Sequence, residues 1–569
     1  MHPASSVLHT LQHVKSYLAT NFSLSNLEVA RIFKEKFQNL LGFLSMKLAS
    51  LSKTVTQFVK HSFWLLFFQS NPFIVQFIYF MAISFAGFLA LKNLKPRGKP
   101  VPRDLDLMFM CVSTATVSSM STIPMEDLSD QQLWVLILLM LLGGEVFTSM
   151  IGLHFNNAKE PPRRSLHSIS RETESNISAN NEYQISVECD QSEAVISHNQ
   201  VQERKSMRHS SRTILAYIVT GYFLATVVCS SVVIISYFWT NSDARKVLQS
   251  KEIKICTFSI FTAVSSFANC GFTPLNSNMK SFRKNSILLL LVIPQILAGN
   301  ILFSPLLRLS VWTMGKLSGK EEYAHILRHP EETGYKNLHT QRNSVYMVLT
   351  VTGLILLQVI FICSFEWDSK AFEGMNWFQK LVGSLFQSVN TRQAGEALFD
   401  ISTFSSPILL LFAIIMYLPS NTSFFPINAD KQPLADKNPS SSAMWKNFAV
   451  TSPACLAVFT FLACITERKS MSADPLNFNV FSIVFEVISA FGNVGYSLGH
   501  SCEKLLKPDA NCRAASYGFV GWWTDEGKLL IIFLMVLGRL KKFILKEEKL
   551  GCAPRAPLQR LDAARLPTP

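Results

Sequence analysis

The sequence predicts an all-α integral membrane protein with four repeats, each a transmembrane helix, a pore half-hairpin and a second transmembrane helix, around one central pore. Of its 569 residues, 49% are hydrophobic and only 16% are charged, whereas soluble domains carry about 25% charged residues. Several runs also lack Asp, Glu, Lys and Arg over about 20 residues, the length of a bilayer-spanning helix. These runs include 73–91, 213–242, 285–307, 343–365 and 401–429. A soluble, single-core enzyme is therefore excluded.

The predicted spans come in four pairs, and each pair encloses a segment that is too short or too polar to cross the membrane alone. The paired spans and their enclosed segments are 73–91 and 133–155 around 105–124, 214–239 and 286–307 around 255–274, 344–365 and 407–426 around 378–396, and 448–465 and 529–543 around 480–498. They define pore repeats A to D, at 71–155, 213–312, 343–429 and 447–545. The last span is the weakest match, because few uncharged residues separate Lys528 from Arg539.

Eight crossings place both termini on the same side of the membrane. The connections on that side are the N-terminal extension 1–70, the polar linker 156–212, the loops 313–342 and 430–446, and the tail 546–569. With the adjoining ends of the spans they contain most of the Lys and Arg, so the positive-inside rule predicts that they are cytoplasmic. One basic cluster, at 92–103, opposes this assignment because it falls in a predicted outside loop.

The charge pattern also limits the partners. The formal net charge is +14, but the basic residues flank apolar runs and form no stripe interleaved with aromatic residues, so we expect a lipid bilayer and no nucleic acid. The eleven Cys show no paired CxxC spacing, so no zinc site or other cofactor is expected. Cys502 and Cys512 are candidates for a disulfide in a predicted outside loop. The chain has no GxxxxGK[ST] motif, which argues against an ATP-driven pump or another enzyme.

The four enclosed segments carry related turn motifs. Segments 265–272 and 489–496 both read S-x-F-x-N-x-G-[FY], the third segment contains NTRQAGE and the first contains TVSSMS. Glycine reaches positive φ without steric cost, which lets neighbouring carbonyl groups turn toward an axis. Four such turns form a ring of oxygens that replaces the hydration shell of a monovalent cation, and the negative C-terminal ends of short helices favour cations there. A single N-x-G is more often only a helix C-cap, but its repetition between paired spans favours the pore.

These motifs resemble the plant HKT family of sodium and potassium transporters, within the wider Trk/Ktr superfamily. The resemblance runs from about 73 to 543 and is carried by LALKNLKP, TVSSMST, LLGGEVFTSM, SSFANCGF, IPQILAGN, KLVGSLFQSVNTR, ITERKS, EVISAFGNVGYS and SYGF. It implies a selectivity filter formed by Ser119, Gly271, Gly395 and Gly495. Serine at the first position is similar to the sodium-preferring subfamily, whereas an all-glycine filter is associated with potassium permeation as well. A β-carbon at Ser119 should restrict φ, so we expect this quarter of the ring to present its carbonyl group differently.

Other residues receive supporting roles. The residues expected to hold the filter turns are Ser118, Asn269, Asn390, Arg392, Glu396 and Asn493. We expect Arg392 and Glu396 to form a local ion pair. Arg539 is either an anchor at the cytoplasmic interface or, as the resemblance implies, a constriction of the pore. The resemblance also implies a gating loop at Ser420, Asn421 and Thr422.

The function expected from these residues is passive, sodium-selective cation transport through a channel-like protein of the plasma membrane. The transported ion would be sodium, with potassium as the alternative. Two other interpretations remain open: a potassium or sodium–potassium symporter of the same fold, and a non-conducting subunit that assembles with other channels. The resemblance implies a homodimer by analogy. The sequence departs from the family at Trp522, where relatives usually have arginine, and in its C-terminal tail.

Overall fold

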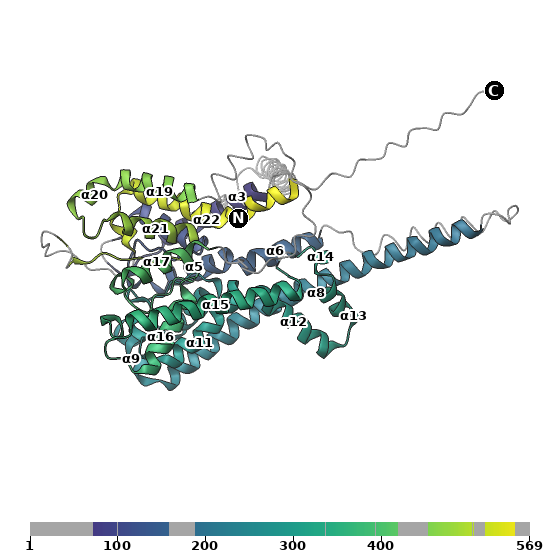
Figure 1. Ribbon diagram of the computed structural model, residues 1–569, viewed down its shortest axis with the longest axis horizontal. Helices are drawn as coiled ribbons and strands as arrows, with labels where there is room; N and C mark the ends of the chain where they lie inside the picture. The colour runs from purple at the N-terminus through teal and green to yellow at the C-terminus, as the bar shows by residue number, and fades with distance from the viewer. Residues whose placement is uncertain are drawn as a thin grey trace, which may run out of the picture. The chain divides into compact units, whose positions relative to one another are not determined.

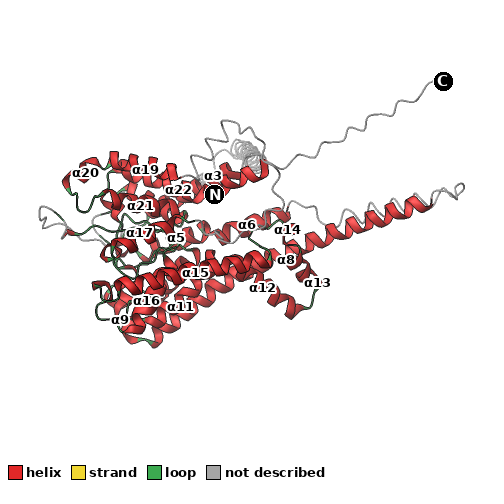
Figure 2. Ribbon diagram, viewed as in Figure 1, coloured by secondary structure: helices red, strands yellow, loops and turns green. Residues whose placement is uncertain are grey.

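The computed structural model describes residues 72–98, 101–158, 188–335, 337–392, 394–418, 453–502, 505 and 518–551. Within these residues the regular structure is helical and contains no β-strand (Figure 2). The contacts divide the chain into Met1–Val75 and Gln76–Pro569, and the arrangement below is that of the second unit. The all-α prediction is confirmed.

Helices lie at all four predicted repeats (Figure 1). Repeat A contains α3 (Pro72–Asn93), α4 (Asp104–Ala115), α5 (Asp130–Gly143) and α6 (Glu145–Ala158). Repeat B contains α8 (Glu188–Thr240), α9 (Ser242–Ser250), α10 (Ile255–Ala268), α11 (Ser286–Ile296), the π-helical turn η4 (Leu297–Ile301) and α12 (Phe303–Ser318). Repeat C contains α15 (Gln341–Glu366), α16 (Trp377–Asn390) and α17 (Ser406–Tyr417). Repeat D contains α19 (Pro453–Thr466), α20 (Arg468–Ala473), α21 (Val480–Gly492) and α22 (Asp525–Gly551). Between repeats B and C lie α13 (Glu321–Arg328) and α14 (Pro330–Thr333).

The four short helices of the half-hairpins, α4, α10, α16 and α21, pack in a closed cycle. Each one contacts the second span of the preceding repeat: α10 contacts α5, α16 contacts α11, α21 contacts α17, and α4 contacts α22. Each also packs against a span of its own repeat, as α16 does against α15 (Figure 1). Because the cycle returns from repeat D to repeat A, the four repeats surround one axis, as predicted.

Glycines set how closely the second spans approach the short helices. In repeats A, B and D, a β-carbon on one glycine of the second span would overlap a backbone carbonyl oxygen near the C-terminal end of the short helix. The pairs are Gly143 with Ala115, Gly299 with Phe267, and Gly538 with Phe491. Because the three contacts lie at equivalent positions, repeats A, B and D share the same close packing between the second span and the short helix, as well as a related sequence pattern.

Two of the second spans are bent, which the sequence did not predict. In repeat A, Gly144 leaves the helical region with φ −59° and ψ 143°, and α5 and α6 meet at 55°. In repeat B the chain turns by 95° after η4, so residues beyond Ile301 do not continue the predicted span 286–307 in a straight line. π-Helical turns and glycines are the usual causes of such kinks.

Length and hydropathy support a membrane-spanning protein. Three helices are long and apolar enough to cross a bilayer, at Phe73–Asn93, Met207–Thr240 and Gln341–Glu366, and the two bent pairs raise this number to five. The shorter apolar helices α17 and α19, together with α22, lie at the other three predicted positions. The outer helices also expose large apolar side chains, such as Phe85 (54% exposed), Tyr217 (70%) and Ile360 (62%), whereas the short helices are mostly buried. An apolar exterior around buried polar segments suits a protein that faces lipid.

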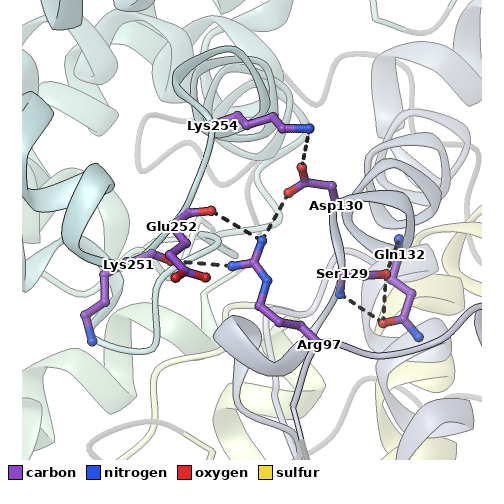
Figure 3. A network of polar contacts seen from close by, with 7 residues as sticks. All are labelled: Arg97, Ser129, Asp130, Gln132, Lys251, Glu252 and Lys254. Atoms are coloured by element: carbon purple, nitrogen blue, oxygen red, sulfur yellow. Dashed lines mark hydrogen bonds and ion pairs between the residues drawn. The ribbon is translucent and has the colours of Figure 1, made fainter.

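The basic cluster that opposed the predicted topology is matched by acidic residues. Arg97 lies 3.4 Å from the Asp130 carboxylate and donates to the backbone carbonyl groups of Lys251 and Glu252, each at 3.4 Å (Figure 3). Lys254 contacts the other oxygen of Asp130 at 2.9 Å (Figure 3). Lys92 likewise pairs with Asp104 at 2.7 Å, and Arg103 with Asp106 at 3.0 Å. The cluster therefore presents less net charge than its sequence suggests, and its Arg97 contacts join repeat A to repeat B.

Candidate ion-binding site

The chain reverses at the end of each short helix in a left-handed backbone conformation. In repeats B and D the helix is capped by a left-handed asparagine, Asn269 (φ 56°) or Asn493 (φ 54°), and the predicted glycine follows two residues later, with φ 79° at Gly271 and 91° at Gly495. In repeat C, Gly395 has φ 74°. The N-x-G pattern thus identified both left-handed positions in repeats B and D.

Repeat A adopts the same alternation without asparagine or glycine. Val117 (φ 51°) and Ser119 (φ 56°) both lie in the left-handed region, which costs an L-residue with a β-carbon about 1–2 kcal/mol. Ser119 thus reaches the left-handed region in spite of its β-carbon, although its φ of 56° is smaller than the 74–91° of the three glycines. That its carbonyl group is presented differently stays a prediction. What distinguishes this turn is the side chain itself.

The four turns that contain residues 119, 271, 395 and 495 are called turns A, B, C and D after their repeats, and they contact one another. A β-carbon on Gly271 would overlap the carbonyl oxygen of Ala394 in turn C, and one on Gly395 would overlap that of Val494 in turn D. A β-carbon on Gly495 would overlap the β-carbon of Ser119 in turn A. The structure thus brings together residues 119, 271, 395 and 495, which are far apart in the sequence, and leaves space for a β-carbon only at residue 119.

Asparagine side chains attach two of the turns to the second spans. With its amide nitrogen facing Ile296, Asn269 donates to that carbonyl oxygen at 3.0 Å, and Asn493 donates to the carbonyl oxygen of Met535 at 3.0 Å. Ile296 and Met535 each precede by three residues the glycine that contacts the short helix, Gly299 and Gly538. Asn493 also donates to Ser118 Oγ at 2.7 Å, so it fixes turn A as well as turn D.

Turn C is held by different groups. Asn390 Oδ1 accepts from the backbone N–H of Glu396 at 3.2 Å, and Gln387 Oε1 accepts from that of Leu398 at 3.2 Å. The predicted ion pair between Arg392 and Glu396 is absent from the described residues. Instead, Glu396 Oε1 accepts from Ser266 Oγ at 2.6 Å. The carboxylate therefore connects turn C to α10 of repeat B, a connection between repeats that the local spacing could not reveal.

Arg539 lies next to the break between α5 and α6. Its guanidinium donates to the carbonyl oxygen of Gly143 and lies over the Phe80 ring, 5.6 Å from the centroid. Lys541, two residues on, donates to the carbonyl oxygen of Phe491 at 3.1 Å. These inward contacts differ from those of an exposed interfacial anchor and place both cations at the C-terminal ends of α5 and α21.

A vestibule opens above the four turns on the side of the predicted outside loops. Its lining includes Ser119, Gly395 and Gly495, together with Phe272, Asn278 and Lys280. Asn278 and Lys280 could not be predicted from the sequence, because they follow the turn motif of repeat B and belong to no motif of their own. Ser420, Asn421, Thr422 and Cys512 lie outside the described residues; Cys502 is disulfide-bonded, and its pairing with Cys512 stays a prediction.

The fold and the site define a multi-pass membrane transport protein in which four re-entrant turns meet below one vestibule. The family model TrkH, described as "Cation transport protein", matches residues 194–424 and 440–545, more than half of the chain. The chain is 68% identical over 552 residues to "Cation transporter HKT1;1" of Oryza sativa subsp. japonica, covering 96% of this chain and 100% of that one. It is 43% identical over 465 residues to "Sodium transporter HKT1" of Arabidopsis thaliana, covering 80% and 90%.

The chain therefore belongs to the TrkH family of cation transport proteins and, within the Trk/Ktr superfamily, groups with the plant HKT transporters. Among solved structures, it is similar to the potassium transporter TrkH from Vibrio parahaemolyticus, with a TM-score of 0.46 and 14% identity over 84% of each chain.

Proposed function

We propose that this protein is a passive, sodium-selective cation transporter or channel of the plasma membrane, in which the ion loses water to backbone carbonyl groups of the four turns. The observation that supports this most strongly is the meeting of residues 119, 271, 395 and 495, all with positive φ, next to one vestibule that Ser119, Gly395 and Gly495 line. Carbonyl rings replace the hydration shell of monovalent cations.

The short helices support cation binding by their direction. α10 and α21 end at the turns, with Asn269 and Asn493 as their C-caps. A helix carries a partial negative charge of about half an elementary charge at its C-terminal end. The turns therefore favour a cation without a carboxylate in the ring itself.

Ser119 is the basis for proposing sodium selectivity. Its Oγ lies 2.8 Å from where a β-carbon on Gly271 would be, and its Cβ lies 3.2 Å from that position on Gly395. The side chain thus occupies space between the turns that a fourth glycine would leave open. A narrower and less regular ring of oxygens suits sodium, because sodium is the smaller ion and tolerates an asymmetric site. Potassium is larger and needs a wide, evenly spaced ring.

The test is current measurement in oocytes under voltage clamp, with sodium and potassium baths exchanged. We expect a reversal potential that follows sodium, and potassium permeation in Ser119→Gly. Ser121→Gly is the matched control, since Ser121 lies two residues further along and also lines the vestibule. Equal potassium permeability in the two variants would contradict the role of Ser119, and potassium-coupled flux in the wild type would favour the symporter. Absence of any current from protein at the cell surface would favour the non-conducting subunit.

The proposed topology, with both termini in the cytoplasm, rests on the excess of Lys and Arg in the connections on that side of the membrane. Tags at the two termini should therefore be accessible only after permeabilisation of the cell. The homodimer and the gating loop stay predictions.

A further inference from the structure

A charge pair lies at the edge of the vestibule. Lys280 belongs to the 3-10 turn η3 (Asn278–Phe282), and its Nζ lies 3.4 Å from Oδ2 of Asp400. Of the described residues that line the vestibule, Lys280 is the only one with a charged side chain. A fixed positive charge therefore lies on the path that leads to a proposed cation site.

The turn that carries Lys280 is attached to two filter turns. Asn278 Nδ2 donates to the carbonyl oxygen of Gly271 in turn B at 3.4 Å, and the backbone N–H of Met279 donates to the carbonyl oxygen of Ala397, just after turn C, at 3.2 Å. Met279 and Phe282 are fully buried on either side of Lys280. The position of the ammonium group is thus fixed relative to the filter.

The two members of the pair differ in exposure and in their other contacts. The Lys280 side chain is 19% exposed and that of Asp400 is 37% exposed. Burial lowers the pKa of Lys280, and the Asp400 carboxylate opposes that shift. Oδ1 of Asp400 also accepts from the backbone N–H and the hydroxyl group of Ser402, at 3.2 and 2.9 Å. The carboxylate is therefore held in place to offset part of the lysine charge.

We propose that Lys280 and Asp400 together set the electrostatic potential of the vestibule, with Lys280 limiting and Asp400 promoting the access of cations to the filter. This inference rests on the proposed function. Charges that line a cleft with low-dielectric walls change the local concentration of ions by factors of ten or more, and partly buried charges are screened less than exposed ones. The pair thus controls how much cation reaches the filter at low external concentration and leaves the choice between ions to the ring of carbonyl groups.

The experiment compares Lys280→Gln, Asp400→Asn and a matched control, Lys284→Gln, by voltage clamp of the full-length protein. Lys284 is exposed in the same connection and lies outside the vestibule lining. At low bath sodium we expect inward conductance to rise about twofold to tenfold in Lys280→Gln and to fall by a similar factor in Asp400→Asn. Lys284→Gln should match the wild type. All differences should shrink when an impermeant organic salt raises the ionic strength, because salt screens charge.

The outcomes separate this inference from the proposed function. If the wild type conducts and Lys280→Gln and Lys284→Gln carry equal currents, the inference alone is overturned. The same holds if the conductance of Lys280→Gln increases but high ionic strength does not reduce that increase. Wild-type protein that reaches the surface but passes no cation current overturns the proposed function and the inference with it. Surface labelling accompanies each variant, and Lys280→Arg, which keeps the charge, should restore wild-type currents if Lys280→Gln acts through charge.

Discussion

Turns A and D share one backbone and differ in the residues that produce it. Turn D uses Asn493 and Gly495, which accept the left-handed region readily, whereas turn A uses Val117 and Ser119. Asn493 donates to its own second span through Met535, but a valine side chain has no donor. Turn A is instead supported from its neighbour, because Ser118 accepts a hydrogen bond from Asn493. The comparison teaches that contacts between repeats support the left-handed backbone of turn A, even where the local sequence disfavours it.

The largest effect should come from adding a β-carbon to turn D. Gly495→Ala places a methyl group against the β-carbon of Ser119 and the carbonyl oxygen of Ser118, so we expect a loss of about 3–5 kcal/mol in the free energy of unfolding. Ser119→Gly should be far less damaging, because the relief of about 1–2 kcal/mol of left-handed strain offsets the entropic cost of glycine, about 0.5–1 kcal/mol. Thermal unfolding in detergent measures both. Gly353→Ala is the control because a β-carbon there has no neighbour within 4 Å; equal stability of Gly495→Ala and Gly353→Ala would contradict the packing of the turns.

The second prediction concerns a buried ion pair between repeat D and repeat A. Lys528 on α22 lies 2.7 Å from the carboxylate of Asp106 on α4, and its side chain is only 2% exposed. Lys528→Met leaves the buried carboxylate of Asp106, whose side chain is 11% exposed, with one partner fewer, so we expect destabilisation of about 3 kcal/mol. The double variant with Asp106→Asn should recover a large part of this loss. If the single and double variants unfold at the same temperature, the pair does not join repeat D to repeat A.

A smaller effect is expected at the cap of turn D. Asn493→Leu removes donors to Ser118 and Met535 and leaves their oxygens without these partners, which costs about 1–3 kcal/mol. Asn493→Gly removes the same bonds but keeps the left-handed backbone, so it should be less damaging than Asn493→Leu. If Asn493→Leu and Asn493→Gly lower the free energy of unfolding equally, the hydrogen bonds of Asn493 matter and its preference for the left-handed backbone does not.

The smallest effect is expected at the loop between α3 and α4 of repeat A, where Arg97 contacts repeat B. Arg97→Gln loses a partly exposed ion pair with Asp130, and such pairs contribute about 1 kcal/mol or less. Lys95→Gln in the same exposed loop is the control. A destabilisation by Arg97→Gln as large as that expected for Lys528→Met would show that this network, rather than the buried pair, holds the repeats together.

The helical positions and the positive φ of Gly271 and Gly495 could be predicted because their signals are local. Uncharged runs report burial in lipid, and N-x-G reports a left-handed turn at Asn269–Gly271 and Asn493–Gly495. Contacts between distant segments had no such signal. The hydrogen bond that Ser266 donates to Glu396 was not predicted. Arg392 is close to Glu396 in the sequence and suggested a local partner instead. Lys280 was missed because nothing near it in the sequence shows that it faces the vestibule.

The sequence by itself determined that this is a helical membrane protein with four related repeats, since hydropathy and turn residues act over a few neighbouring positions. Only the tertiary structure decided the left-handed backbone of Val117 and Ser119, the bends at Gly144 and η4, and the position of Lys280 in the lining of the vestibule. The physical reason is that each of these features depends on close packing between repeats. Such packing overrides a backbone preference of about 1–2 kcal/mol, and the local pattern of residues does not encode which partner provides it.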